Sequence, residues 1–374
     1  MDLYVDLVEA EKQHYNYINT KSDKYKVNVI NGWADEPFVK RDGKDKFIKE
    51  FQTEFNSPFW ELYCYQVLKQ LGCSFDFQKP YPDFVSKYKG SPFLVECTIA
   101  KNASNTPAES DYNAKFSETR SSEERVHSQV IRLANSIQQK KDKLINQYHK
   151  NVDNIDKPYV IAVEPFDQPF FTDTGTEAIT TLLYGWIIDH TTEREYACSS
   201  AIKENKSEVP IGIFTNAEYA DVSGILYSNM ATIGKVDAIG DNPNLTFEHA
   251  RYNLQRTKPQ VSVDSRIKDD KFDPRCKAIR KHFNDRSSLY KQYSIRKPFI
   301  MWETKYTETL TDGLYYFANP YAKFPLSKEL IDEMYSSGIS IISYDTENNS
   351  YIDSQLHDGS IISRFVLNLK RSYI

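Results

Sequence analysis

The sequence is poor in the residues from which several common kinds of site are built. Its 374 residues include only five cysteines, an odd number, and no CxxC pair. This pattern disfavours both a disulfide framework and a zinc cluster and is typical of a reducing compartment. The seven histidines show no HxH or HExxH spacing, which disfavours a zinc hydrolase. Neither a glycine-rich phosphate loop nor a GxSxG motif occurs, so the sequence predicts neither a P-loop NTPase nor a hydrolase with a nucleophilic serine in that motif.

Long apolar runs are missing as well. The longest, residues 179–188, is short and is interrupted by Thr, Tyr and Gly, so it does not predict a membrane span. The first residues are acidic and contain no apolar run, so we expect no secretory signal. We therefore expect a soluble, cytoplasmic protein without membrane association. Its 40% hydrophobic and 14% aromatic residues suffice for a packed core of one large domain or two ordinary ones.

The order of the predicted elements is that of an α/β protein. Ser57, followed by proline, predicts the start of a helix that Gly72 ends. We expect a short strand at 74–78, a hairpin with strands 83–88 and 91–100, a loop at 102–120, a helix at 122–148 and a buried strand at 159–163. Further on we expect helices at 176–188 and 326–336 and strands at 209–214, 222–227 and 298–306. This order predicts an α/β fold with a mixed central β-sheet flanked by helices.

The chain divides into four stretches on composition and pattern. We expect a loosely structured lead-in at 1–45, an α/β core at 46–240, a basic segment at 241–297, and strands and a helix at 298–374 that complete the domain.

The predicted hairpin places two carboxylates opposite each other. A two-residue turn at Lys89-Gly90, with positive φ, pairs Phe84 with Val95 and Asp83 with Glu96. Directly opposed side chains lie about 4.5–5.5 Å apart at Cβ, and two such charges repel by roughly 3 kcal/mol at an effective dielectric of about 20. The pair therefore needs a shared proton, a basic partner or a divalent cation.

We interpret the pair as a metal site, because the flanking residues are apolar and indicate partial burial. Taken singly, each carboxylate has a simpler explanation. Asp83 is a turn residue after a proline, and Glu96 is an edge-strand charge that faces water.

Residues 251–297 form a basic segment in a chain of net charge −5. They contain 14 Lys and Arg against 5 Asp, with five Tyr and Phe interleaved. Such a mixture suits phosphate contact with base stacking, and it equally suits a solvated basic segment that neutralises acidic neighbours. Arg275, Lys277, Arg280 and Lys281 are the candidate nucleic-acid contacts within it.

The carboxylate hairpin and the element order over about residues 50–165 resemble the PD-(D/E)XK nuclease superfamily, which has the restriction-endonuclease-like fold. The resemblance, that of a divergent member, implies that Asp83 and Glu96 bind Mg²⁺ or Mn²⁺, with the backbone carbonyl of Cys97 nearby. It also implies that Glu61, on the preceding helix, extends the metal shell. The alternative for Glu61 is an ordinary glutamate favoured by the helix dipole.

The catalytic lysine of the superfamily is replaced here by Thr98. Lys101 is the first candidate to take its place, although a regular strand would point it away from Glu96. Lys87 is another candidate on the hairpin. Gln129 and Lys140, on the long helix, are expected to support the site and contact nucleic acid.

These features predict a metal-dependent nuclease that hydrolyses phosphodiester bonds, with DNA as the favoured substrate and a homodimer as an open possibility. The resemblance suggests a role in restriction or anti-phage defence. The alternative is a catalytically inactive nuclease-like fold that binds nucleic acid or protein, because the usual lysine is missing. A glycosidase with paired carboxylates is disfavoured by the absence of a sugar-binding pattern.

Overall fold

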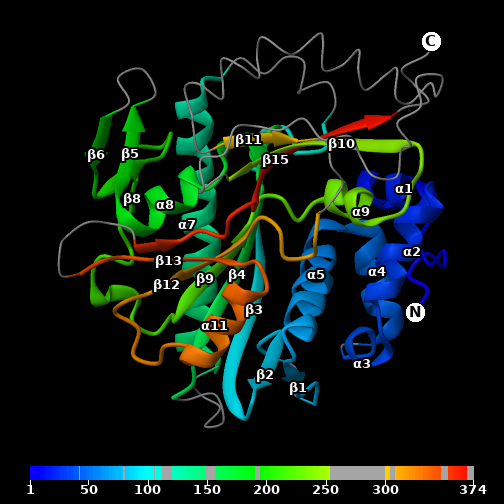
Figure 1. Ribbon diagram of the computed structural model, residues 1–374, viewed down its shortest axis with the longest axis horizontal. Coiled ribbons are helices and arrows are strands. Elements are labelled where there is room, and N and C mark those ends of the chain that lie inside the picture. Colours follow the sequence, from blue (N-terminus) through cyan, green and yellow to red (C-terminus); the bar gives the residue numbers. More distant parts are fainter. Residues whose placement is uncertain are drawn as a thin grey trace.

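The computed structural model describes residues 1–41, 43–78, 81–104, 106–111, 120–148, 156–189, 194–252, 300–303, 308–346 and 353–368. Its centre is a mixed sheet in the order β1-β2-β3-β4-β9-β12-β13-β14, with helices on both faces (Figure 1). The predicted α/β class with a mixed central sheet flanked by helices is thereby confirmed. No helix within the described ranges is long and apolar enough to cross a membrane.

The strands of the central sheet run in both directions. β3 pairs in parallel with β4, and β4 with β9, whereas β2 is antiparallel to β3 and β12 is antiparallel to β9. The strands of this sheet are β1 (Ser74–Phe75), β2 (Phe84–Tyr88), β3 (Ser91–Lys101), β4 (Tyr159–Phe166), β9 (Gly224–Ser228), β12 (Leu314–Ala318), β13 (Ser340–Ser343) and β14 (Asp353–Gln355).

Three smaller sheets accompany it. They are formed by β5 (Trp186–Asp189) with β6 (Arg194–Ala197), by β7 (Ser200–Ile202) with β8 (Glu208–Pro210), and by β11 (Ile300–Glu303), β10 (Leu245–Tyr252) and β15 (Ile361–Asn368) in that order.

The helices form two layers. One layer packs on the face of β3 that carries Val95 and Cys97, and it includes α5, which donates the Trp60 indole N–H to the carbonyl of Ala162 in β4 at 3.1 Å. The other face packs against α7 and α8. The helices are α1 (Tyr15–Lys21), α2 (Lys24–Trp33), α3 (Glu36–Val39), α4 (Lys44–Thr53), α5 (Asn56–Gln70), α7 (Ser122–Asn146), α8 (Glu177–Tyr184), α9 (Ile233–Ile239) and α11 (Lys328–Ser336), with 3₁₀ turns η1 (Ala10–Lys12), η4 (Phe171–Thr174) and η5 (Ala217–Tyr219).

The hairpin forms in the predicted register. Phe84 pairs with Val95 and Tyr88 with Ser91, and the turn residues Lys89 and Gly90 have φ of 46° and 90°. Positive φ at both turn positions is what a two-residue hairpin requires. β2 begins at Phe84, one residue later than predicted, so Asp83 lies immediately before the strand.

Four local predictions are wrong. The helix expected at 176–188 ends at Tyr184 and residues 186–189 form β5, and the strand expected at 209–214 ends at Pro210. Residues 1–45 are not loosely structured: they form η1, α1, α2, α3 and the start of α4, because their aromatic and aliphatic side chains pack into the α5-side core. The α5 helix begins at Asn56, so Ser57 is not its N-cap. Phe55 takes the N-cap position instead, where its buried ring stacks on Phe59 at 5.3 Å and fixes the start of the helix by packing.

A buried ionic cluster joins α9, β15 and the segment before β12. The Glu308 carboxylate accepts hydrogen bonds from both the Nε and Nη2 of Arg364, with Nε at 2.6 Å, and forms an ion pair with Lys235 Nζ at 2.8 Å. Burial acts to raise the pKa of Glu308, but the neighbouring Arg364 and Lys235 outweigh it and hold the pKa well below its usual range. The three side chains are almost completely removed from water.

Replacing Gly224 with alanine is expected to destabilise the protein, because the added Cβ would lie 2.6 Å from the Phe317 carbonyl and 2.6 Å from the Tyr316 ring. Overpacking of this kind costs about 1–3 kcal/mol of unfolding free energy. Gly32→Ala is the matched control, since a Cβ on this α2 residue meets nothing within 4 Å and gains up to about 1 kcal/mol of helix propensity. Urea unfolding would measure the change in unfolding free energy for each variant. A change of the same sign in both variants would contradict this packing.

Glu308→Gln is expected to lower the unfolding free energy by about 3–5 kcal/mol at neutral pH, because it leaves two buried cations without their carboxylate. Since the folded-state pKa of Glu308 is depressed, its stabilisation is complete above the ordinary value of 4.5 and is lost only as the pH falls through the lower folded-state pKa. Denaturant unfolding should therefore show a constant difference from the unmodified protein over about pH 5–8. A difference in unfolding free energy that already shrinks within that pH range would refute the lowered pKa of Glu308 in the folded protein.

Candidate functional site

A polar cavity of about 730 Å³ opens where β2 begins, between the first turns of α5 and the middle of α7. It contains three carboxylates and several cations. Its lining residues are Ser57 and Glu61 from α5, Asp83 before β2, Glu96, Cys97, Thr98, Ile99 and Lys101 from β3, and Arg132, Asn135, Ser136, Gln138, Gln139, Lys140 and Lys143 from α7. The cavity therefore gathers most of the residues that the sequence assigned to the site.

Asp83 is positioned by the edge of β3. This strand continues to Lys101, past the point where β2 begins, and the Asp83 carboxylate accepts a hydrogen bond from the Cys97 backbone N–H at 2.7 Å. The carboxylate thus satisfies a backbone donor that no strand partner reaches. On its other side, the Asp83 backbone carbonyl accepts a hydrogen bond from Arg41 Nη1 at 2.9 Å. Both contacts fix the Asp83 carboxylate at the rim of the cavity.

Arg41 also connects the Asp83 backbone to α5. Its Nη2 donates to Glu61 Oε2 at 2.8 Å, and the guanidinium is almost fully removed from water. Burial raises the pKa of Glu61, and Arg41 opposes this only in part. Glu61 therefore belongs to the cavity and is not a freely solvated helix-dipole glutamate.

Glu96 is the most deeply buried carboxylate of the site, with 1% of its side chain exposed. Its Oε1 accepts hydrogen bonds from Lys140 Nζ at 2.6 Å and Lys143 Nζ at 3.1 Å, and its Oε2 accepts one from the Tyr148 hydroxyl at 2.9 Å. Lys140 and Lys143 are three residues apart on α7 and so share one helix face. Burial acts to raise the pKa of Glu96, but Lys140, Lys143 and Tyr148 outweigh it and lower the pKa.

Asp83 is in the opposite electrostatic situation. Burial raises its pKa well above the usual range, and the neighbouring carboxylates of Glu61 and Glu96 raise it further. The predicted pairing of Asp83 with Glu96 is not part of the strand ladder, which ends at Phe84 and Val95, but both carboxylates line the same cavity. Of the three means of relieving their repulsion, the structure shows the basic partner, supplied by Arg41, Lys140 and Lys143.

The donor set of the cavity fits a hard divalent cation held by few protein ligands. No group of three or more His, Cys, Asp or Glu side chains in the described residues is arranged to hold a metal ion. Mg²⁺ requires less, because it keeps several waters and is commonly bound through one or two carboxylates. Asp83 and Glu96 supply that number, and Oδ1 of Asp83 has no hydrogen-bond partner among the described residues.

The remaining predicted residues differ in their positions. Thr98 and Lys101 line the cavity, but Lys101 is 57% exposed and its Nζ pairs with Glu54 at 2.9 Å, at the rim. Gln129 lies outside the cavity: it is fully buried and its amide donates to Asp167 at 3.0 Å, so it is not accessible to a nucleic acid in this structure. The candidates in the basic segment, Arg275, Lys277, Arg280 and Lys281, lie outside the described residues.

Three contributors were not assigned to the site from the sequence. Lys143 could have been found, because it follows Lys140 by three residues on the polar face of a predicted helix. Tyr148 is the last residue of that predicted helix and lies two residues beyond the end of the observed α7, and no local pattern indicates its contact with Glu96. Arg41 comes from a stretch in which no element was predicted.

Comparison of the chain with protein-family models, with curated proteins and with solved structures finds no match.

The two lysines on Glu96 are expected to contribute unequally to stability. Lys140 is 19% exposed, so Lys140→Met should lower the unfolding free energy by about 1–3 kcal/mol by leaving a buried carboxylate short of a donor. Lys143 is 43% exposed, and Lys143→Met should cost less than about 1 kcal/mol, because water screens and replaces its contact. Urea unfolding at neutral pH compares the two variants. Equal losses would show that Glu96 is not buried as described.

Proposed function

We propose that this protein is a metal-dependent nuclease that hydrolyses phosphodiester bonds, with DNA as its favoured substrate. One observation carries the proposal: Asp83 and Glu96 line the same cavity as a set of cations from α7. Acidic oxygens that suit a divalent cation thus lie beside positive groups that suit a phosphate. A role in restriction or anti-phage defence is part of the same proposal and rests on the resemblance alone.

The α7 wall of the cavity supplies groups for a phosphodiester backbone. The Arg132 Nε donates to the Lys101 carbonyl at 2.6 Å and its Nη2 to the Asn102 carbonyl at 3.2 Å, which holds the guanidinium at the end of β3. A guanidinium fixed in this way retains further N–H donors for phosphate oxygens. Lys143, with nearly half of its side chain exposed, adds a further positive charge to the same wall.

Asp83 and Glu96 would hold Mg²⁺ or Mn²⁺, and Glu61 would extend its shell through water. The ion would supply Lewis-acid polarisation of the phosphate and a lowered pKa of bound water. Lys140 would contact Glu96 together with the metal ion and would stabilise the negative charge that develops on the phosphate. Thr98, at the usual position of the lysine, carries no charge. The cationic role is therefore assigned to Lys140 and not to Lys101, because Lys140 contacts Glu96 whereas Lys101 pairs with Glu54.

A second function is favoured by the charge balance of the cavity. Arg41, Lys140 and Lys143 already oppose the three carboxylates, so these carboxylates have positive partners without a metal ion. A protein of this design could bind nucleic acid, or another protein, without cleaving anything.

Asp83→Asn is expected to abolish cleavage, because it removes one of two carboxylate ligands while keeping the side-chain volume. Mutation of a residue that only orients a metal ligand lowers metal affinity or activity by about 10–100-fold, so removal of a direct ligand should lower activity by at least ~100-fold. The measurement is the cleavage rate of plasmid, single-stranded DNA and RNA with Mg²⁺, with Mn²⁺ and with EDTA. Asp332→Asn is the matched control, since this exposed α11 carboxylate pairs only with Lys328 among the described residues.

Metal-dependent cleavage that Asp332→Asn retains and Asp83→Asn loses would support the nuclease. Cleavage that survives in Asp83→Asn would overturn the site. Salt-sensitive binding without cleavage under any metal condition, unchanged by Asp83→Asn, would establish the binding module instead.

A further inference from the structure

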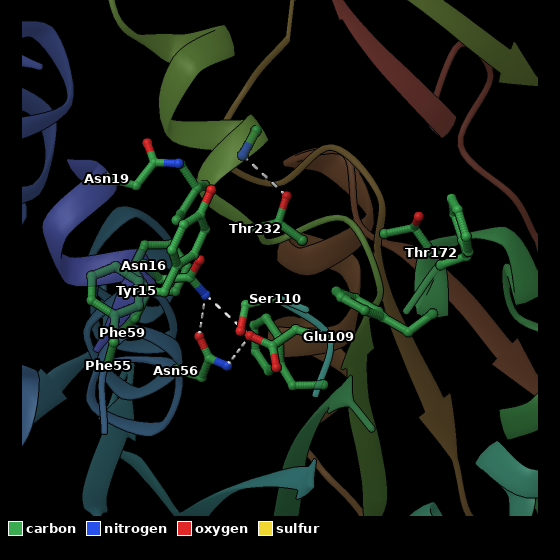
Figure 2. Close-up of a pocket in the computed structure, with 15 residues that line it drawn as sticks. Tyr15, Asn16, Asn19, Phe55, Asn56, Phe59, Glu109, Ser110, Thr172 and Thr232 are labelled. Carbon is green, nitrogen blue, oxygen red and sulfur yellow. Dashed lines mark hydrogen bonds between the residues drawn. The ribbon is translucent and has the colours of Figure 1, made fainter. Parts of the chain in front are cut away.

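A second cavity, of about 330 Å³, lies on the other side of the first turn of α5. Figure 2 shows Tyr15, Phe55 and Phe59 on one side of it and Thr172 on the opposite side, with Glu109 and Ser110 between them and Thr232 above. The walls come from α1, α5, the segment after β3, the turn at η4 and the start of α9. A volume near 300 Å³ is at the lower end of small-ligand pockets.

The floor of this cavity is a fixed set of amides and a carboxylate. Asn56 Nδ2 donates to Glu109 Oε1 at 2.7 Å, and Asn16 Nδ2 donates to the same oxygen at 3.1 Å and to Asn56 Oδ1 at 2.9 Å (Figure 2). Both amides thus hold one carboxylate oxygen of Glu109. Its other oxygen, Oε2, has no hydrogen-bond partner in the part of the chain that the structure describes. The cavity therefore presents an oriented acceptor for a ligand that carries an N–H group.

Two aromatic rings at this cavity are left unusually open to water. Tyr15 is 56% exposed and Phe170 is 36% exposed, although both line the cavity beside buried phenylalanines. Phe170 is held there by a left-handed backbone conformation, with φ of 60°, which is unfavourable for a residue with a side chain. Strain of this kind is found where a structure holds a residue in place for a ligand.

Flat ligands with hydrogen-bonding edges match this combination. Nucleobases stack on aromatic side chains, and every base offers a π-face for this contact. Asn pairs with the edge of adenine, and Glu or Asp accepts from the exocyclic amino group of cytosine. Thymine offers no exocyclic amino group to Glu109 Oε2, and its one donor on the pairing edge, N3–H, lies between two carbonyl oxygens that repel a carboxylate.

The two cavities share the first turns of α5. Phe55, Asn56 and Phe59 line the smaller one, whereas Ser57 and Glu61 line the carboxylate cavity. A helix is about 10–12 Å across with its side chains, so the two cavities are within reach of one short nucleic-acid strand.

We propose that the smaller cavity binds one unstacked nucleobase with an exocyclic amino group, from the strand whose backbone lies at the carboxylate cavity. The inference rests on the proposed nuclease function for the position of the strand, and it specifies a substrate that is unpaired at this base. Tyr15 and Phe170 stack on the base, and Glu109 accepts from its amino group.

Binding of labelled dA, dC and dT homo-oligonucleotides of equal length, measured by fluorescence anisotropy in EDTA, tests this without requiring cleavage. The unmodified protein should bind dA and dC oligomers more tightly than dT. Tyr15→Ala should weaken binding of all three by about 5- to 100-fold through lost stacking. Tyr196→Ala is the matched control, because this tyrosine is also largely exposed, at 48%, and does not line the cavity.

Glu109→Gln separates base reading from stacking. The two asparagine amides would hold the oxygen of the new side chain and turn its NH₂ group toward the ligand, so the preference for dA and dC over dT should disappear. Equal binding of all three oligomers by the unmodified protein, or variants that bind as it does, would overturn the proposal.

Mononucleotides distinguish a strand from a free ligand. dCMP that binds in a manner sensitive to Glu109→Gln, while oligonucleotide binding is not, would assign the cavity to free nucleotides and overturn the strand model. These binding measurements are made without metal. Their outcome is therefore independent of the cleavage experiment with Asp83→Asn. Base preference without any cleavage would support the cavity and refute the nuclease.

Discussion

The burial of Glu96 in the middle of β3 is the constraint around which the candidate site is arranged. An ionised carboxylate that is 1% exposed must be surrounded by donors, because an unpaired charge in the interior is very costly. Lys140, Lys143 and Tyr148 meet this requirement from α7 and the residue just beyond it. The position and rotation of α7 against the sheet are thereby tied to one side chain, and the helix carries its cations into the cavity as a result.

The α5 helix is the boundary between two different kinds of recognition. On one side it presents Glu61 to a polar, charged cavity, and on the other it presents Phe55, Asn56 and Phe59 to a smaller aromatic one. Its start is set by the packing of Phe55 against Phe51 and Phe59 and by no capping side chain. The relative position of the two cavities therefore depends on an aromatic core that extends into the N-terminal helices.

Local patterns predicted the hairpin, because Lys89-Gly90 and the alternating residues around it specify a turn and a register within a few positions. The same local view could not supply Arg41, which lies 20 residues before Glu61 and reaches it only through tertiary packing. Gln129 shows the converse error. Its polar side chain on a helix suggested a surface contact, but it is buried and hydrogen-bonded to Asp167 and Thr174. Residue type and spacing indicate a face of a helix, but only the fold decides what covers that face.

The cluster of Lys235, Glu308 and Arg364 constrains the order in which the chain can complete its interior. Glu308 and Arg364 are 56 positions apart, and Lys235 precedes both. During synthesis on the ribosome, Lys235 and Glu308 therefore emerge well before the arginine that donates two hydrogen bonds to the buried Glu308 carboxylate. We expect β10 and α9 to remain hydrated and loosely docked until β15 arrives, so that this half of the molecule consolidates late. A nascent chain stalled before β15 should accordingly be a better target for chaperones and proteases than one released just after it.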